Sequence, residues 1–203
     1  MKTMEAYRTS FERVVKSEGE AILSLLQTVD QDTVSRIVEL LIKVKAEKRR
    51  VVTVGCGTSG AAAKKIAHSL CCVEIPATFL SPATAAHGAM GYIQEGDLVI
   101  LVTKGGNTAE LLGLLPCCKE KGAIVVGVCE NEGSKLAQAA DIFLKVCIES
   151  EPCPWGLLAT ASTLAVIAVW DAIIITAMQY NGFTREQFLC IHPGGAVGEK
   201  LAR

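Results

Sequence analysis

The sequence carries almost no excess of charge of either sign. Twenty Lys and Arg residues stand against 21 Asp and Glu residues, which leaves a formal net charge of −1. Domains that bind nucleic acids or acidic membranes usually show a strong positive excess. We therefore expect no nucleic-acid partner and no membrane partner, whereas a small neutral or anionic ligand remains open.

The sequence also lacks any Cys-x-x-Cys pair, although it holds nine cysteines. The adjacent pairs at 71–72 and 117–118 have poor spacing for tetrahedral zinc, so we expect no structural metal. The number is odd and most cysteines lie in apolar runs, where a free thiol behaves as a small hydrophobic group. Reduced thiols without disulfides favour a cytoplasmic location.

No secretory signal is evident, because the first twenty residues carry charges throughout and lack an apolar centre. One stretch, 153–170, is free of charge and long enough to suggest a membrane span. It follows Pro152, runs into Asp171 and is rich in Ala, Ser and Thr. These features favour a helix of about 157–181 that is buried in a core or a subunit interface. Such burial predicts a homo-oligomer, a dimer or a tetramer.

The N-terminal quarter is predicted to be helical. Apolar residues recur at helical spacing over 4–28 and 31–49, with a break near Asp30. The mixed charges of this segment suit solvated helix faces better than a DNA-binding arm, and a helix-turn-helix is disfavoured. We expect residues 1–50 to form a helical extension packed on the domain that follows.

From residue 51 the pattern predicts an α/β fold. Five apolar runs alternate with helical stretches, at 51–54, 76–80, 97–102, 123–128 and 141–146. This alternation is typical of a parallel sheet with helices on both faces, so residues 51–203 are predicted to form one three-layer sandwich. Ligands bind beyond the carboxyl ends of such strands, which directs attention to the turns after 54, 80, 102 and 146.

The first of these turns spans 55–60, Gly-Cys-Gly-Thr-Ser-Gly, and precedes a helix expected to begin near Ala61. Its glycines let the backbone approach a ligand, the helix N-terminus offers free amides, and Ser59 adds a hydroxyl. A dinucleotide fingerprint has the same glycine spacing, with an acidic residue at about the position of Glu74. The turn alone does not separate a nucleotide from a sugar phosphate.

The third turn, 103–108, reads Thr-Lys-Gly-Gly-Asn-Thr. Hydroxyls at 103 and 108, the ammonium of Lys104 and backbone amides are expected to converge there. Two such turns in one sheet suggest one phosphate held between them. The alternative is a glycine-rich turn in which Asn107 or Thr108 only caps a helix.

The order of motifs resembles the SIS (sugar isomerase) domain, a flavodoxin-like fold, and in particular the arabinose-5-phosphate isomerase branch of that family. The resemblance runs from about residue 51 to the C-terminus. It is carried by five segments in order: Gly57-Thr58-Ser59-Gly60, Ala85-Ala86-His87-Gly88, Thr103-Lys104-Gly105-Gly106-Asn107-Thr108, Glu151-Pro152-Cys153-Pro154-Trp155-Gly156 and His192-Pro193-Gly194-Gly195-Ala196-Val197-Gly198.

The resemblance implies an aldose–ketose isomerase that needs no cofactor and no metal. Isomerisation through an enediol needs a base near a carbon-bound proton and a donor near the carbonyl oxygen. His192 and Glu151 match catalytic positions of the family, in which the C-terminal histidine often reaches a neighbouring subunit, and His87 is the third candidate. The predicted substrate- and phosphate-binding residues are Gly57, Thr58, Ser59, Thr103, Lys104, Gly106, Asn107 and Thr108.

Three positions depart from the family pattern. Thr58 replaces a lysine, Gly105 a serine and Asn107 a glutamate. Because an amide takes no proton at neutral pH, a base role at 107 is lost, while Lys104 restores a positive charge near the phosphate. The family's pair of CBS domains is not expected, because the sequence ends five residues after Gly198.

Two function classes follow from this sequence. The first is a working isomerase acting on arabinose 5-phosphate, ribulose 5-phosphate or a related sugar phosphate. The second is a sugar-phosphate-binding sensor or regulatory protein without catalysis, as the changes at 58 and 107 suggest. We favour the enzyme, because a pure binder would not need acid/base candidates at both 151 and 192. A dehydrogenase is disfavoured, since only the first turn supports a nicotinamide site.

Overall fold

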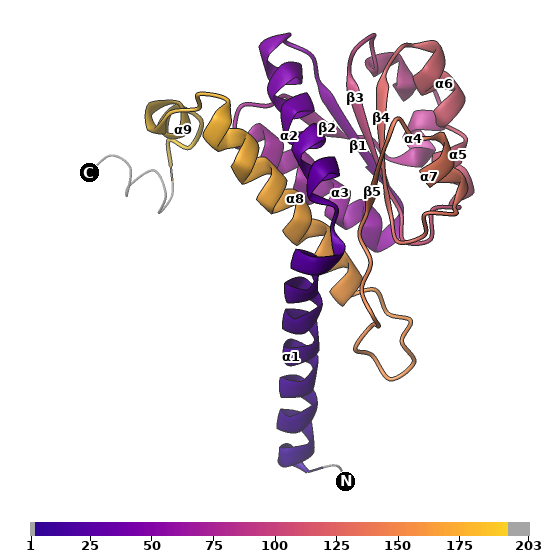
Figure 1. Cartoon of the computed structure of the whole chain (residues 1–203), viewed down its shortest axis with the longest axis vertical. Helices are drawn as coiled ribbons and strands as arrows, with labels where there is room; N and C mark the ends of the chain where they lie inside the picture. The colour runs from indigo at the N-terminus through magenta and orange to yellow at the C-terminus, as the bar shows by residue number, and fades with distance from the viewer. Residues whose placement is uncertain (1–2, 195–203) are drawn as a thin grey trace.

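The computed structural model describes residues 3–194 and contains a five-stranded parallel sheet between two layers of helices (Figure 1). The strands lie in the order β2-β1-β3-β4-β5. Every strand falls within one of the predicted apolar runs or extends it by one residue, so the predicted fold class is confirmed. The strands are β1 (Val51–Gly55), β2 (Ala77–Phe79), β3 (Leu98–Val102), β4 (Ile124–Cys129) and β5 (Ile142–Lys145).

The central strands are apolar on both sides because helices cover both faces of the sheet. In β3, Leu98 and Ile100 pack into one core, whereas Val99 and Leu101 pack into the other. All four side chains are fully buried. A continuous apolar run in the sequence therefore reports a strand buried between two layers.

Three long helices cover the first face: α2 (Gln31–Ala46), α3 (Gly57–Cys71) and α8 (Ala161–Tyr180). The longest helix, α1 (Met4–Thr28), contacts α8 and then runs away from the body of the molecule as an arm (Figure 1). Asp30 begins α2, because its carboxylate accepts hydrogen bonds from both the amide and the hydroxyl of Thr33.

Shorter helices cover the second face. They are α4 (Pro82–Ala86), η1 (Ala89–Tyr92), α5 (Ala109–Leu112), α6 (Leu115–Glu120) and α7 (Lys135–Ala139). The helix expected after the third turn is split into α5 and α6, and Pro116 lies in the first turn of α6. The last helix, α9 (Arg185–Ile191), follows the C-terminal end of α8.

Within residues 3–194, α8 is the single helix with the length and apolarity that a membrane span would need. Trp170 and Ile173 of this helix are nevertheless completely buried against the sheet layer. Core helices satisfy the same length and composition criteria, so the feature is weak support for a span. The contacts of α8 with α1, α2 and α3 agree with the predicted core position.

The chain changes direction between β1 and β3. After β1 it enters α3 on the first face, and after β3 it enters α5 on the second face. Because β1 and β3 are neighbours, their outgoing turns diverge and leave a crevice at the carboxyl edge of the sheet. The first and third turns, which the sequence predicts to be anion sites, border this crevice.

Candidate functional site

The first turn is tighter than the sequence suggests. Helix α3 begins at Gly57 and not near Ala61, so Thr58 and Ser59 already belong to its first turn. A Cβ atom on Gly60 would lie 2.6 Å from the carbonyl oxygen of Gly55, so strand and helix pack backbone to backbone. Cys56 caps the helix without a side-chain hydrogen bond. The first amides of α3 therefore face the crevice without a capping partner.

The third turn presents two hydroxyls together. The hydroxyls of Thr103 and Thr108 are hydrogen-bonded at 2.7 Å, and Thr103 is mostly buried. Thr108 occupies the N-cap position of α5, but its hydroxyl makes no capping bond and pairs with Thr103 instead. This arrangement differs from the alternative in which the side chain of Thr108 only caps a helix.

Gly106 and Asn107 face the neighbouring turn after β4. A Cβ atom on Gly106 would lie 2.1 Å from the hydroxyl oxygen of Ser134, which makes glycine necessary there. The side-chain oxygen of Asn107 accepts a hydrogen bond from the amide of Lys135 at 3.1 Å. The two residues thus hold the third turn against its neighbour, and neither lines the two cavities described below.

A small cavity of about 40 Å³ joins the first and third turns. Its polar lining comes from Thr58 and Ser59 on one side, from Thr103 and Lys104 on another, from Glu130 after β4, and from Ser162 and Thr163 at the start of α8. A single water needs roughly 10–15 Å³ of such space, so the cavity has room for a group with a few oxygen atoms. The structure therefore brings four of the predicted phosphate-binding residues together.

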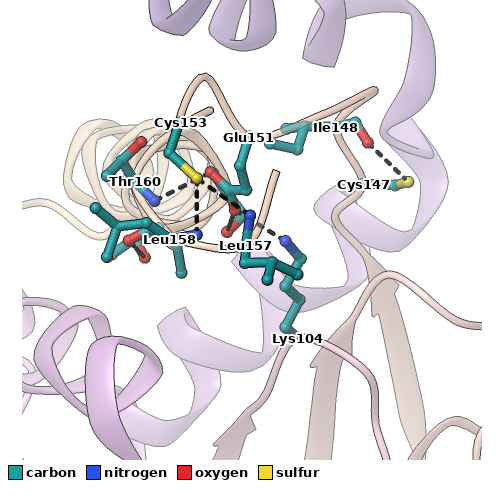
Figure 2. Close-up of polar contacts among 11 residues, drawn as sticks. Lys104, Cys147, Ile148, Glu151, Cys153, Leu157, Leu158 and Thr160 are labelled. Atoms are coloured by element: carbon teal, nitrogen blue, oxygen red, sulfur yellow. Dashed lines mark hydrogen bonds and ion pairs between the residues drawn. The ribbon is translucent and has the colours of Figure 1, made fainter. Parts of the chain in front are cut away.

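Glu151 lies beside this cavity with its side chain completely buried (Figure 2). One carboxylate oxygen accepts hydrogen bonds from the ammonium of Lys104 at 2.9 Å and from the hydroxyl of Ser162. The other accepts from the amides of Thr160 at 3.0 Å and Ser162 at 3.4 Å. The carboxylate thus caps α8 and holds Lys104 at the cavity.

These contacts determine the charge of Glu151. Burial by itself raises the pKa of a carboxyl group, but hydrogen bonds from Ser162, Lys104 and the amide of Thr160 outweigh it and lower the pKa to about 2. The group is therefore ionised at neutral pH and holds a proton poorly. This environment suits an electrostatic partner better than a base.

The loop after Glu151 is closed by Cys153. Its sulfur accepts hydrogen bonds from the amides of Leu157 and Leu158, both at 3.2 Å (Figure 2). These bonds, with the amide of Leu158 first, lower the pKa of the Cys153 thiol. Arg13 of the arm donates to the carbonyl oxygen of Pro152 at 2.9 Å, which ties this loop to α1.

A larger cavity of about 470 Å³ lies on the other side of the first turn. Gly57 and Cys56 form one wall, and the loop after β2 contributes His87. Two residues that the sequence analysis passed over, Lys64 of α3 and Glu110 of α5, complete its charged lining. Glu110 follows the third turn by only two residues, but no sequence pattern shows which way a helix of four residues faces.

His192 lies far from these cavities within one chain. It follows α9, its ring stacks on Phe188 at 4.1 Å, and its Nδ1 lies 3.1 Å from the carbonyl oxygen of Phe188. Glu151 caps the opposite end of α8, a helix of 20 residues and thus about 30 Å in length. The structure does not bring His192 and Glu151 together, and 195–198 of the same motif lie outside the described residues (Figure 1).

The dinucleotide alternative does not fit the geometry. Glu74 precedes β2 and therefore lies at the amino edge of the sheet, opposite the crevice. Its carboxylate accepts a hydrogen bond from Gln187 at 2.9 Å and lies 3.9 Å from the ammonium of Lys45. It cannot reach a ribose bound at the first turn.

Across residues 3–194, no group of three or more His, Cys, Asp or Glu side chains is arranged to hold a metal ion. All nine cysteines are free thiols. The site therefore consists of hydroxyls, backbone amides, the charged pair Lys104–Glu151 and Glu130, together with the residues around the larger cavity.

Among proteins of known sequence, an arabinose 5-phosphate isomerase KdsD of Pseudomonas aeruginosa is 40% identical over 192 residues, which cover 95% of this chain. An arabinose 5-phosphate isomerase KpsF of Escherichia coli is 33% identical and covers 95% of the chain. The chain spans 58% and 60% of the lengths of these relatives.

Solved structures agree with the fold. A Listeria monocytogenes protein superposes with a TM-score of 0.93 at 44% identity and covers 96% of this chain and 100% of its own. An Escherichia coli CFT073 protein in complex with arabinose 5-phosphate superposes with a TM-score of 0.84 at 28% identity, covering 95% and 100%. The family model of the SIS domain matches residues 46–176, and the chain therefore belongs to the SIS domain family.

Proposed function

We propose that this protein is a sugar-phosphate isomerase that interconverts an aldose and a ketose through an enediol, with arabinose 5-phosphate and ribulose 5-phosphate as the first candidates. The observation that carries the proposal is the pair of adjoining cavities at the β1–β3 crevice. The names of the relatives, with identities of 33% and 40%, support the substrate class.

The small cavity is the proposed phosphate seat. Ser59 and Thr103 supply hydroxyls, the start of α3 supplies amides, and Lys104 supplies a positive charge. Thr58 stands where the family pattern has a lysine. Lys104 of the third turn then supplies the positive charge for the phosphate. Gly57 shapes the turn through its left-handed backbone, with φ of +54°. The seat is supported indirectly by Gly106 and Asn107, which hold the third turn against the turn after β4, and by Thr108, whose hydroxyl pairs with Thr103.

The larger cavity is the proposed place of the sugar chain. Its volume of about 470 Å³ is of the size that small-ligand sites commonly have. His87 directly follows α4 and is exposed at this cavity, so it is suited to bind or protonate sugar oxygens. Glu151 is assigned the electrostatic role, since it fixes Lys104 and the start of α8.

We further propose that His192 acts in the site of a neighbouring copy, in a dimer or tetramer. Within one chain α8 separates it from the cavities by about 30 Å. The arm and the loop after Glu151 carry exposed apolar side chains that assembly would cover, among them Tyr7, Phe11 and Leu157. In such an assembly, residues 1–50 would contact neighbouring copies as well as the domain of their own chain. The nine free thiols favour a cytoplasmic location.

The second candidate is a sugar-phosphate-binding protein without catalysis. Two observations favour it: Glu151 is fully hydrogen-bonded with a pKa of about 2, and Asn107 stands where the family pattern has a carboxylate. Such a protein would keep the phosphate seat and lack a group that removes a carbon-bound proton.

A panel of pentose and hexose phosphates separates the two candidates. Binding is measured by thermal shift, and turnover by a coupled assay and by uptake of deuterium from solvent into the sugar. We expect both binding and turnover. A protein that binds members of the panel yet neither converts them nor exchanges a proton is the binding protein of the second candidate.

A further inference from the structure

The phosphate seat contains a carboxylate that the proposed function leaves unexplained. Glu130 follows β4 and lines the small cavity together with Lys104, and within residues 3–194 these two residues carry the only charged side chains of its lining. A carboxylate beside a bound phosphate is a like charge and opposes binding. Its position in an anion site therefore needs a reason.

The backbone keeps Glu130 next to Lys104. The amide of Thr103 donates a hydrogen bond to the carbonyl oxygen of Val128 at 3.1 Å, and the amide of Glu130 donates to the carbonyl oxygen of Lys104 at 3.0 Å. The segments after β3 and β4 thus stay hydrogen-bonded beyond the ends of the two strands. Both side chains start from this connected backbone at the edge of the cavity.

Lys104 does not neutralise Glu130. Its ammonium lies 2.9 Å from a carboxylate oxygen of Glu151, whose side chain is completely buried. In the part of the chain that the structure describes, the carboxylate of Glu130 makes no ion pair and no hydrogen bond. Two carboxylates therefore accompany one ammonium at the seat, and the negative charge of Glu130 is left uncompensated.

The next carboxylate along the chain has a different environment. Glu132 is exposed, lies outside the small cavity and pairs with the ammonium of Lys145 at 3.1 Å. Glu130 is only partly exposed. Because solvent and salt screen a partly buried charge less than a surface charge, Glu130 should act more strongly on a ligand in the cavity.

This repulsion has unequal consequences for different anions. Inorganic phosphate can use only the seat, so no other contact offsets the repulsion. A sugar phosphate also reaches the larger cavity, where His87 and Lys64 are available to its hydroxyl and carbonyl oxygens. A repulsive group lowers the affinity for every anion, but ligands without a sugar have no further contacts that compensate for it.

We propose that Glu130 is a specificity-determining residue that keeps the phosphate seat free of inorganic phosphate and other small oxyanions. The sugar part of the ligand is then required for binding. This role rests on the proposed function, because it takes the small cavity as the phosphate seat. Glu130 sets the affinity of the seat and takes no part in proton transfer.

The test uses Glu130→Gln, which removes the charge and keeps the shape of the side chain. Isothermal titration with arabinose 5-phosphate and with inorganic phosphate compares this variant with the wild type, followed by whichever member of the sugar-phosphate panel the wild type binds. We expect both ligands to bind about tenfold more tightly to the variant. Glu132→Gln is the matched control and should bind both ligands like the wild type.

Further variants separate charge from shape. Glu130→Asp keeps the charge and should bind as weakly as the wild type, whereas Glu130→Ala removes it with a different side chain and should bind more tightly. Higher ionic strength should reduce the difference between Glu130→Gln and the wild type, because salt screens a repulsion between charges. Thermal unfolding of each variant shows whether it is folded under the conditions of the titration.

The outcomes are distinct for the two levels of the argument. Unchanged or weaker binding in Glu130→Gln and Glu130→Ala overturns the role of Glu130 and leaves the proposed isomerase intact. Tighter binding in Glu130→Asp assigns the effect to shape and overturns the role as well, as does a wild type that binds inorganic phosphate as tightly as a sugar phosphate. A wild type and a Glu130→Gln variant that bind no member of the panel overturn the proposed function itself.

Discussion

The third-turn side chains of the small cavity and two titratable side chains of the larger cavity differ in whether they have hydrogen-bonding partners. In the small cavity Thr103 is bonded to Thr108, and Lys104 to Glu151. In the larger cavity the side chains of His87 and Glu110 have no hydrogen-bonding partner within the described residues. Paired groups are held rigidly and suit binding, whereas unpaired groups at an open cavity are available for proton transfer.

The largest expected effect concerns catalysis across a subunit boundary. His87→Asn and His192→Asn should each lower kcat by about 10²-fold or more, with phosphate binding largely intact. If His192 serves a neighbouring site, coexpression of the two variants rebuilds some complete sites. Random pairing in a dimer would then restore up to about a quarter of wild-type activity.

Mixed oligomers that stay as inactive as the single variants would contradict a shared site. Light scattering at micromolar concentration gives an independent check, because a monomer cannot share its site. As a control, His192→Asn is coexpressed with a second copy of the same variant that carries a different affinity tag. This mixture should regain no activity.

The next effect concerns stability and pH at Glu151. Its folded-state pKa is depressed from 4.5 to about 2, so its contribution is present above pH 5 and is lost as the pH falls towards 2. The shift corresponds to on the order of 3 kcal/mol. Glu151→Gln should therefore be less stable than the wild type at pH 7, and this difference should shrink between pH 5 and pH 2.

Urea unfolding followed by circular dichroism across that pH range measures the difference. Glu12→Gln, on the exposed face of the arm, serves as the control and should follow the wild-type curve. A difference between Glu151→Gln and the wild type that stays constant with pH would show that the carboxylate is not held ionised by its partners.

A smaller effect is expected at the phosphate seat. Ser59→Ala and Thr103→Val should each weaken binding of a sugar phosphate by about 1–3 kcal/mol, because a ligand oxygen loses its partner. Isothermal titration with arabinose 5-phosphate and with inorganic phosphate measures both. Equal affinity in the two variants and the wild type would show that the phosphate does not bind in this cavity.

The smallest effect should come from Thr108→Val. Thr108 bonds to Thr103 and does not line the cavity, so it acts on the ligand only through its neighbour. We expect a loss below about 1 kcal/mol, the usual net value of one neutral hydrogen bond. A loss as large as that of Thr103→Val would mean that Thr108 contacts the phosphate directly.

The sequence was informative wherever a pattern had one structural solution. The apolar runs of four to six residues predicted the five strands, of which β1 and β3 are buried on both faces, and their carboxyl edge indicated where the candidate site lies. The start of α3 at Gly57 was predicted too late, because glycines are poor helix formers and only tertiary packing on Gly55 selects helix there. The division of the third-turn helix into α5 and α6 was missed as well.

Contacts between segments that are distant along the chain could not be predicted from the sequence. Nothing in the motifs shows that Asn107 binds the turn after β4, or that Glu110 and His87 line the same cavity. The low pKa of Glu151 depends on Ser162, which is distant by eleven residues and belongs to a helix of mostly apolar residues. The position of His192 at the far end of α8 likewise required the three-dimensional arrangement.

The backbone contact between Gly55 and Gly60 limits how this turn can diverge among descendants of one ancestor. A side chain at either position would collide with the main chain at the other, so neither residue can be exchanged alone. Thr58, by contrast, is exposed between them and can change its chemistry without disturbing the packing. A lineage can therefore replace the family's lysine at this point in a single mutational step while the scaffold that presents it stays fixed.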